Sequence, residues 1–154
     1  MPHIHEKIDF TVEVFIVYKN KVLLRMHEKY HRWLSVGGHI ELDESPIEAA
    51  IREVKEEVGL DVIISGNLPP VEDESDYKHL IAPRYFGCSY VNDTHRHMTF
   101  VYFATSETDV ITESVYDHEK KCETRWLTKE ELESMDLRPN ILFYATKALE
   151  ELGE

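Results

Sequence analysis

The sequence predicts an α/β fold in which a mixed β-sheet packs between helices. Two observations predict it. Several short segments have the alternating or continuous apolar residues of strands, and three further segments combine helix-start signals with apolar residues at three- and four-residue spacing. These segments are mixed along the chain, as expected for helices on the faces of a sheet. A length of 154 residues with 42% hydrophobic residues fits one domain, residues 1–154, with a buried core.

The first strands are expected near the N-terminus. In residues 10–17 the apolar side chains of every second position predict a strand. Asn20 and Lys21 then form a turn into a second strand around 22–24. A polar stretch at 27–32 follows and leads through 33–36 to the pair Gly37-Gly38.

The clearest helix is expected at 45–58. Ser45 and Glu48 form a capping box, with Pro46 at the first helical position, and Gly59 stands where a C-terminal cap belongs. The apolar stripe of this helix is predicted to face the core. Its members are Ile47, Ala50, Ile51, Val54 and Val58.

A surface loop and two strands are expected next. Residues 61–64 are predicted to be extended, and residues 65–76 to form a polar loop of the kind that often carries specificity. Strands are predicted at 84–91 and 97–105, separated by a turn at 92–93. Within the second of these, Phe100 to Ala104 are apolar on both faces, which is typical of a central strand.

The C-terminal part is predicted to hold one strand and two helices. The strand is expected at 121–127, and Thr128 with Glu131 forms a second capping box that begins a short helix. Pro139 begins the last helix. The inner face of this helix is predicted to contain Ile141, Ala145, Ala148, Leu149 and Leu152.

The composition excludes several classes of function. Seventeen Lys and Arg residues against thirty Asp and Glu residues give a net charge of −13. Such a surface repels nucleic-acid polymers and anionic lipid, so an anionic substrate would need a metal ion to bridge it to the protein. No apolar run long enough to span a membrane and no signal peptide is visible. Cys88 and Cys122 are expected to be reduced core residues, which indicates a cytoplasmic protein.

Three glutamates form a second feature of the helix at 45–58. At about 100° per residue, Glu53, Glu56 and Glu57 cluster roughly 120° from the apolar stripe. Like charges at this spacing weaken a helix, and Glu57 lies near its negative C-terminal end. Lys55 and Arg52 can compensate in part, but a bound divalent ion compensates better. An all-oxygen donor set favours Mg²⁺ or Mn²⁺ over Zn²⁺.

A glutamate-rich helix face is usually only solvated, so the spacing of the neighbouring residues decides. Gly38 is followed after five residues by Glu44, and after seven more by Arg52-Glu53-Val54-Lys55-Glu56-Glu57-Val58-Gly59-Leu60. Seven fixed residue types at ~7% usage each match by chance at about 10⁻⁸ per starting position. Chance therefore does not account for the pattern.

The pattern resembles the Nudix box of the Nudix hydrolase family, with no departure from it. Trp33 shortly before the glycine pair and the stretch from Glu123 to Trp126 are also similar to the family. One departure lies just before the box, where Val36 occupies the position of a common proline. This difference affects the rigidity of the turn and not the metal site.

The resemblance implies an α/β/α sandwich with a mixed β-sheet and a hydrolase that cleaves a nucleoside diphosphate linked to another group X. It implies that Glu53, Glu56, Glu57 and the backbone carbonyl of Gly38 bind Mg²⁺ (or Mn²⁺). It also implies that Glu44 and Arg52 pair and brace the loop against the helix.

The general base has more than one candidate. Family members use a glutamate of the box or one from a later loop. Here the later candidates are Glu119, in the expected loop 114–120, and Glu123, on the expected strand. The sequence does not choose between them.

Substrate contacts are expected from Tyr77, which could stack on a base, and from Arg25, which could hold a terminal phosphate. Tyr77 stands where relatives that hydrolyse dinucleoside polyphosphates often have tyrosine. His95 and His97 are two residues apart on or near a strand. No third metal ligand stands at a spacing typical of a zinc site, so both are predicted to be surface histidines.

The substrate stays open at this level. Nucleoside triphosphates, dinucleoside polyphosphates and sugar nucleotides similar to ADP-ribose are all compatible small-molecule partners. An alternative is a non-catalytic nucleotide-binding or sensor domain with the same fold, although every metal ligand of the box is present. A solvated acidic helix with no ligand is a third hypothesis, and a homodimer stays open.

Overall fold

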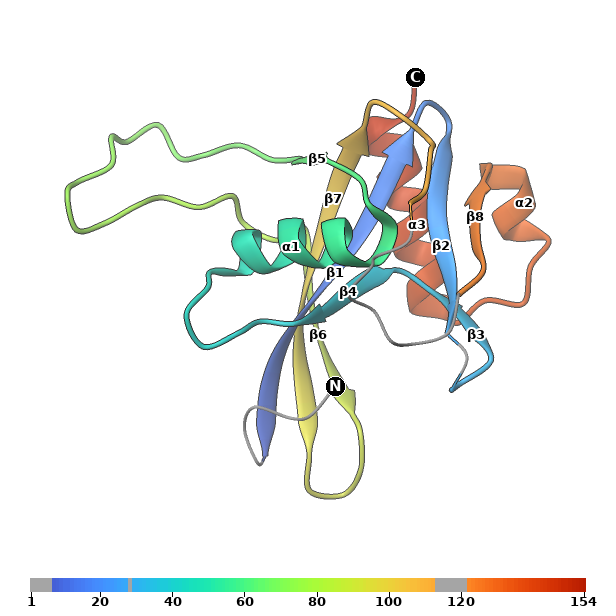
Figure 1. The fold of residues 1–154 in the computed structure, drawn as a ribbon, viewed down its shortest axis with the longest axis horizontal. Coiled ribbons are helices and arrows are strands. Elements are labelled where there is room, and N and C mark those ends of the chain that lie inside the picture. The colour runs from blue at the N-terminus through green and yellow to red at the C-terminus, as the bar shows by residue number, and fades with distance from the viewer. Residues whose placement is uncertain (1–6, 28, 113–121) are drawn as a thin grey trace.

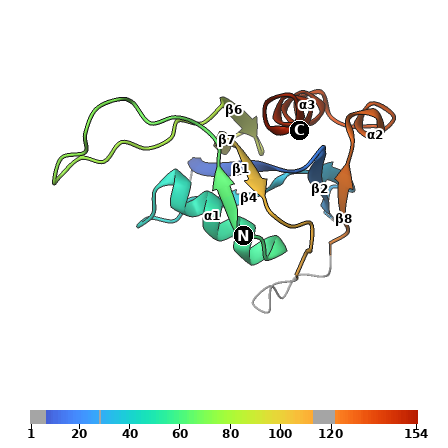
Figure 2. The same cartoon turned by 90° about the horizontal axis from the view of Figure 1, so that it is seen from above.

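Helices cover both faces of an eight-stranded mixed β-sheet (Figures 1 and 2). The structure is a computed structural model that describes residues 7–27, 29–112 and 122–154. Its elements are β1 (Ile8–Tyr18), β2 (Lys21–His27), β3 (Arg32–Leu34), β4 (Val36–His39), α1 (Pro46–Val58), β5 (Val62–Ile64), β6 (Tyr85–Tyr90), β7 (Arg96–Ser106), β8 (Thr124–Leu127), α2 (Lys129–Glu133) and α3 (Pro139–Leu152). No helix in these ranges is long and apolar enough to span a membrane.

The centre of the sheet is β1, which pairs with three other strands. On one edge it runs parallel to β7, from the pair Ile8–Arg96 to the pair Val17–Thr105. On its other edge it is antiparallel to β4 in its first half and to β2 at its end. The strand β7 also pairs with β6 and β5, and β2 pairs with β3 and β8. The mixed sheet predicted from the sequence is confirmed.

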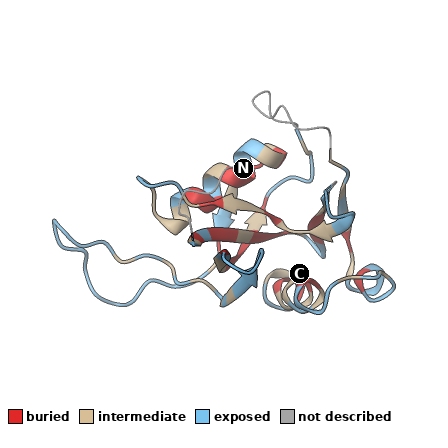
Figure 3. Cartoon of the chain, turned by 90° about the horizontal axis from the view of Figure 1, so that it is seen from below, coloured by how far each residue is buried: buried red, intermediate tan, exposed pale blue. Residues whose placement is uncertain are grey.

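Alternation along β1 separates the core into two layers. Val12 and Val14 face the layer beneath α1, whereas Phe15 and Val17 face the layer beneath α3. Figure 3 shows the buried residues concentrated in the sheet and on the sides of the helices that cover it. Each side chain of β1 therefore belongs to one face of the sheet, as the two-residue period of a strand requires.

The helix α1 begins and ends where the sequence predicts. The Ser45 side chain accepts a hydrogen bond from the Glu48 backbone N–H at 3.2 Å, and Gly59 adopts the left-handed conformation with φ of 72°. A side chain at Gly59 would also collide with Thr112, so glycine is required there. One predicted member of the buried stripe is wrong: Ile51 is 45% exposed, and Ala49 is fully buried instead. The buried face of α1 is therefore centred nearer to Ala49, Ala50 and Val54.

The other predicted elements agree in type and differ at their ends, whereas the strands β3 and β4 were not predicted, because segments of three and four residues are too short for a clear alternating pattern. The predicted strand at 121–127 begins only at Thr124 among the described residues, and the Thr128 capping box is present with both of its hydrogen bonds. The central position of β7 is confirmed, with residues 101–104 buried. The prediction of two core cysteines is wrong, since Cys88 is exposed and Cys122 is half-buried. The strand β6 lies at an edge of the sheet, so Cys88 has no layer to cover it.

The longest irregular segment connects β5 to β6 through residues 65–84. In Figure 1 it extends away from the sheet beyond α1. Apart from a bridge between Glu74 and Tyr77, it forms no strand or helix. It is therefore longer than the predicted loop 65–76, and most of its side chains are exposed.

Candidate functional site: a glutamate cluster between α1 and β4

The second half of α1 lies against the glycine pair of β4. The backbone N–H of Gly37 donates a hydrogen bond to Oε1 of Glu57 at 3.2 Å. A Cβ atom on Gly38 would lie 2.5 Å from Oε1 of Glu53, so this position has no room for a side chain. Gly38 thus leaves the space that the Glu53 carboxylate occupies, which explains its place in the pattern, whereas Gly37 is needed for the close approach of β4 to Val12 on β1.

The glutamate cluster consists of Glu53, Glu56 and Glu57 on α1. Arg52 connects four oxygen-bearing groups around it. Its Nε and Nη2 atoms donate to the two carboxylate oxygens of Glu44 at 3.0 and 2.6 Å. Its Nη1 atom donates to Glu53 at 2.9 Å and to Glu56 at 3.2 Å. Nη2 also donates to the backbone carbonyl of His39 at 2.9 Å. The pairing of Glu44 with Arg52 is the one the resemblance implies, and the structure adds the other three acceptors.

Glu57 has a second cationic neighbour. The Nη1 atom of Arg25, on β2, forms a hydrogen-bonded ion pair with Oε2 of Glu57. Both side chains are largely buried. From the sequence alone, Arg25 is expected only to hold a terminal phosphate. Its contact with Glu57 was missed because it depends on how β2 and α1 pack, for which the sequence contains no local signal.

The electrostatics of the cluster show a shortage of positive charge. Burial raises the pKa of Glu53, and the Arg52 guanidinium offsets only part of this. Burial raises the pKa of Glu57 to about 8, with Arg25 acting in the opposite direction and the Glu53 charge adding to the increase. Glu44, by contrast, has a lowered pKa because it accepts the hydrogen bonds of Arg52. Two of the three clustered carboxylates therefore hold a proton more readily than a free glutamate does when no metal ion is near.

The exposure of Glu53 differs from the sequence-based expectation. It was predicted on a face well away from the apolar stripe, yet the residue is only 4% exposed. The glycine backbone of β4 leaves space beside the helix, and the carboxylate occupies it. Glu56 is half-exposed, with 49% of its side chain accessible, so it forms the outer side of the cluster.

The donor set fits a divalent metal ion. Three carboxylates from α1 and the nearby backbone of Gly38 are all hard oxygen donors, which suits Mg²⁺ or Mn²⁺. A cation of charge two would also supply the positive charge that the raised pKa values of Glu53 and Glu57 call for.

The other predicted site residues lie outside this cluster. Glu123 immediately precedes β8, and its exposed carboxylate accepts a hydrogen bond from Arg125 at 2.9 Å. Tyr77 is 61% exposed on the 65–84 segment, where its ring contacts His79. Glu119 lies outside the described residues.

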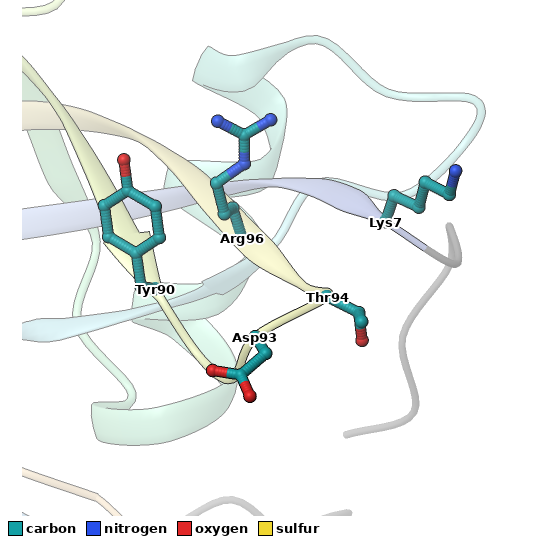
Figure 4. Close-up of a pocket in the computed structure, with 5 residues that line it drawn as sticks. All are labelled: Lys7, Tyr90, Asp93, Thr94 and Arg96. Atoms are coloured by element: carbon teal, nitrogen blue, oxygen red, sulfur yellow. The ribbon is translucent and has the colours of Figure 1, made fainter.

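A pocket on the described part of the molecule lies away from the glutamate cluster. One shallow pocket lies at the turn between β6 and β7 (Figure 4). Its lining residues are Lys7, Tyr90, Asp93, Thr94 and Arg96. None of these belongs to the glutamate cluster.

The prediction that His95 is a surface residue is wrong. It is 3% exposed, and its Nε2 atom lies 3.2 Å from Oδ2 of Asp9. His97 is half-buried beside it, with ring centroids 5.2 Å apart. The parallel pairing of β1 with β7 brings Asp9 next to these histidines, and a contact between residues so distant in sequence leaves no local pattern.

Comparison with known proteins gives one family. The NUDIX domain model matches residues 9–147. A hydrolase of the NUDIX family from Clostridium perfringens is 41% identical, with 94% of this chain and 97% of that chain covered and a TM-score of 0.83. A MutT protein from Methanosarcina mazei Go1 shares the fold at 19% identity, with 98% and 99% covered and a TM-score of 0.62. The dihydroneopterin triphosphate pyrophosphohydrolase of E. coli does so at 18% identity, with 95% of each chain covered and a TM-score of 0.62.

Proposed function

The chain belongs to the NUDIX family and is a Nudix hydrolase, and from this premise we propose that it is a pyrophosphohydrolase dependent on Mg²⁺ or Mn²⁺. Its substrate would be a nucleoside diphosphate linked to another group X. The observation that carries the proposal is the contact of the Glu53 and Glu57 carboxylates with the glycine backbone of β4, where both have raised pKa values. Such a site is prepared for a cation.

The metal-binding role is assigned to Glu53, Glu56, Glu57 and the carbonyl of Gly38. A divalent ion bound there would neutralise phosphate charge and acidify an attacking water, which is what cleavage of a phosphoanhydride requires. With a net charge of −13, the protein itself offers an anionic substrate little attraction. This argues that the ion also takes part in substrate binding.

Arg52 and Glu44 are proposed as positioning residues. Arg52 joins the carboxylates of Glu44, Glu53 and Glu56 to the carbonyl of His39 at the end of β4. This network fixes the direction in which the Glu53 and Glu56 oxygens point. Preorganised oxygens cost no rearrangement when a cation arrives.

The proton-accepting role is left to one of two glutamates, Glu119 or Glu123. A base of this kind takes the proton of the attacking water and need not hold the metal ion itself. The exposed carboxylate of Glu123, beside Arg125, is accessible to a bound substrate. Arg25, at the inner end of the cluster beside Glu57, is proposed to contact the terminal phosphate.

A substrate panel tests this function. Nucleoside triphosphates, dinucleoside polyphosphates and ADP-ribose would be incubated with the protein and Mg²⁺, Mn²⁺ or a chelator, and the release of phosphate, pyrophosphate and nucleoside monophosphate would be measured. We expect at least one substrate to be cleaved with either metal ion and none with the chelator. Full activity in the chelator would contradict the proposal.

The panel also separates a hydrolase from a sensor domain. If nucleotides bind in a calorimeter but no phosphoanhydride is cleaved with any metal ion, the chain is a binding module. The matched control is Lys55→Gln, on the same helix, whose side chain pairs with the exposed Asp61 and not with the cluster. This variant should retain the activity of the wild type, whereas Glu56→Gln should not.

A further inference from the structure

A second group of side chains of the types that bind metal ions lies on the opposite face of the sheet from the glutamate cluster. It contains Asp9, His39, His95 and His97, and is called here the histidine cluster. Oδ2 of Asp9 is 3.4 Å from Nε2 of His39 and 3.2 Å from Nε2 of His95. One ligand atom each of Asp9, His95 and His97 lie within 4.8 Å of one another. The rings of His39 and His97 are 5.0 Å apart, centroid to centroid.

Strand pairing places all four residues on one face. Asp9 is the register partner of His97 across β1 and β7, and His39 is the partner of Thr11 across β1 and β4. Residues two apart on a strand share a face, so Thr11 joins Asp9. His95 directly precedes β7, and its contact with Asp9 places it beside His97. Figure 1 shows this end of β1 and β7 extending past the helices. Three strands therefore bring their side chains together where neither α1 nor α3 covers the sheet.

The distances match those between neighbouring ligands of one ion. A tetrahedral Zn²⁺ with bonds of about 2.0–2.1 Å to nitrogen and oxygen holds adjacent ligand atoms about 3.3–3.4 Å apart. The two Asp9–histidine distances, 3.4 and 3.2 Å, are close to this value. Both imidazole nitrogens are directed at the same carboxylate oxygen of Asp9.

Burial gives an independent reason for a cation. Asp9 is fully buried, and His39 and His95 are 7% and 3% exposed. Burying an ionised carboxylate costs several kcal/mol unless a positive charge accompanies it. Next to Asp9 along the sheet, the hydroxyls of Thr11 and Thr99 form a hydrogen bond with each other at 2.8 Å. These neighbouring side chains carry no charge. A positive charge beside Asp9 can be an imidazolium or a bound ion.

We propose that Asp9, His39, His95 and His97 bind a transition-metal ion of the Zn²⁺ class, at a site separate from the glutamate cluster. Imidazole nitrogens with one carboxylate suit Zn²⁺, whereas Mg²⁺ prefers a set made only of oxygens. The two sites thus select different ions. Because its ligands come from β1, β4 and β7, the ion cross-links the end of the sheet and stabilises it.

Calorimetry with Zn²⁺ alone tests the site. The full-length protein would be treated with chelator, dialysed, and titrated with Zn²⁺ in excess Mg²⁺, which occupies the glutamate cluster. We expect one equivalent of Zn²⁺ to bind. His97→Gln should weaken this binding roughly 100-fold or more, as expected for the loss of one ligand. His79→Gln, on the 65–84 segment, is the matched control and should bind as the wild type does.

Two further measurements show at which cluster the ion binds. Zn²⁺ should raise the Tm of the wild type and of Glu56→Gln but not that of His97→Gln, which shows that the folded variant has lost the site. Co²⁺ in place of Zn²⁺ should give the intense visible spectrum of a tetrahedral site in the wild type only. Absence of stoichiometric Zn²⁺ binding, which means an imidazolium–aspartate cluster, would overturn the proposal. Binding equal in the wild type and His97→Gln but lost in Glu56→Gln would also overturn it, because the ion would then be at the glutamate cluster.

Discussion

Arg52 holds Glu44 with two parallel hydrogen bonds, Nε to Oε2 at 3.0 Å and Nη2 to Oε1 at 2.6 Å. Glu44 also accepts the backbone N–H of Glu41 at 2.8 Å through Oε1. The connection between β4 and α1 is therefore tied at both ends to one guanidinium, since Nη2 also reaches the carbonyl of His39. This arrangement depends on the planar shape of the guanidinium as well as on its charge.

Arg52→Lys should therefore reduce activity although the charge is kept. Lysine cannot make the paired bonds to Glu44 and also reach Glu53. We expect kcat/KM to fall about 10–100-fold, the range typical when a partner of metal ligands is lost. Steady-state kinetics at increasing Mg²⁺ measure this, and part of the loss should be recovered at high metal concentration. A variant with wild-type kcat/KM at low Mg²⁺ would remove Arg52 from a positioning role.

Glu56→Gln and Val54→Ala should separate chemistry from stability on one helix. Glu56 is half-exposed, so its substitution should lower kcat by orders of magnitude through weaker metal binding and leave the metal-free Tm unchanged or slightly higher. Val54 is fully buried on the inner side of α1, so truncation of its side chain should cost about 1–3 kcal/mol of unfolding free energy. The catalytic rate of the folded fraction should not change. Thermal melts with and without Mg²⁺, paired with initial rates, test both. A metal-free Tm for Glu56→Gln well below the wild type would make that face structural.

Metal binding should release a proton near neutral pH. Without metal the pKa of Glu57 is raised to about 8, so at pH 7 this carboxyl is mostly protonated and must lose its proton to bind a cation. The apparent affinity for Mg²⁺ should therefore rise with pH by up to about tenfold per unit below pH 8, and level off above it. Calorimetry in buffers of different ionisation enthalpy measures the protons released. Glu57→Gln should abolish the release, and a wild type that releases none at pH 7 would contradict the prediction.

The same raised pKa has a consequence for stability. A carboxyl with a higher pKa in the folded than in the unfolded state favours folding at low pH, and this contribution is lost as the pH rises past the unfolded value. Neutral glutamine avoids that loss. Metal-free Glu57→Gln should thus match the wild type in acid and equal or exceed its Tm at pH 7, as urea or thermal unfolding at both pH values would show.

One of the later glutamates should behave as the general base. Either Glu119→Gln or Glu123→Gln is expected to lower kcat by about 10²–10⁴ with little change in KM. The pH dependence of kcat should lose its acidic limb in the same variant. Arg125→Gln is the control for Glu123, since it removes the ion-pair partner and leaves the carboxylate. If neither glutamate variant loses even tenfold, the base belongs to the glutamate cluster itself.

Tyr77 should contribute to substrate binding if its exposed ring stacks on a nucleotide base. Tyr77→Ala would then cost about 1–3 kcal/mol of binding free energy, seen mainly in KM. Tyr77→Phe, which keeps the ring, is the matched control and should restore KM. Tyr90, also exposed but on β6, offers a second control at Tyr90→Ala, which should have no effect. An unchanged KM in Tyr77→Ala would exclude stacking by this residue.

The type of most elements could be predicted from the sequence, because local signals determine it, but the short strands β3 and β4 carry no such signal. Ser45 and Gly59 mark the ends of α1, and Thr128 marks the start of α2, through bonds within a few residues. The exact face of α1 could not be predicted in the same way. Ile51 and Glu53 exchange their expected exposures because the glycine pair of β4 makes room for a carboxylate, and that depends on tertiary packing.

The two clusters also differ in how far they could be predicted from the sequence. The glutamate cluster follows from spacing, since Glu53, Glu56 and Glu57 lie on one helix and form a local pattern. The pairing of Arg25 with Glu57 and the approach of Asp9 to His39 and His95 join residues far apart in the chain. Only strand register and helix packing bring them together, so no run of residues indicated them.

The neighbours Gly38 and His39 face opposite sides of the sheet, one toward each cluster. A shift of β4 by a single residue against β1 would reverse the two, placing an imidazole where the Glu53 carboxylate needs space and a bare backbone where Asp9 needs a partner. One insertion or deletion in β4 would thus abolish both sites together. Both sites therefore constrain the length of this four-residue strand. Substitutions in β4 also have to keep a small residue facing the glutamate cluster and a metal-ligating residue facing the histidine cluster.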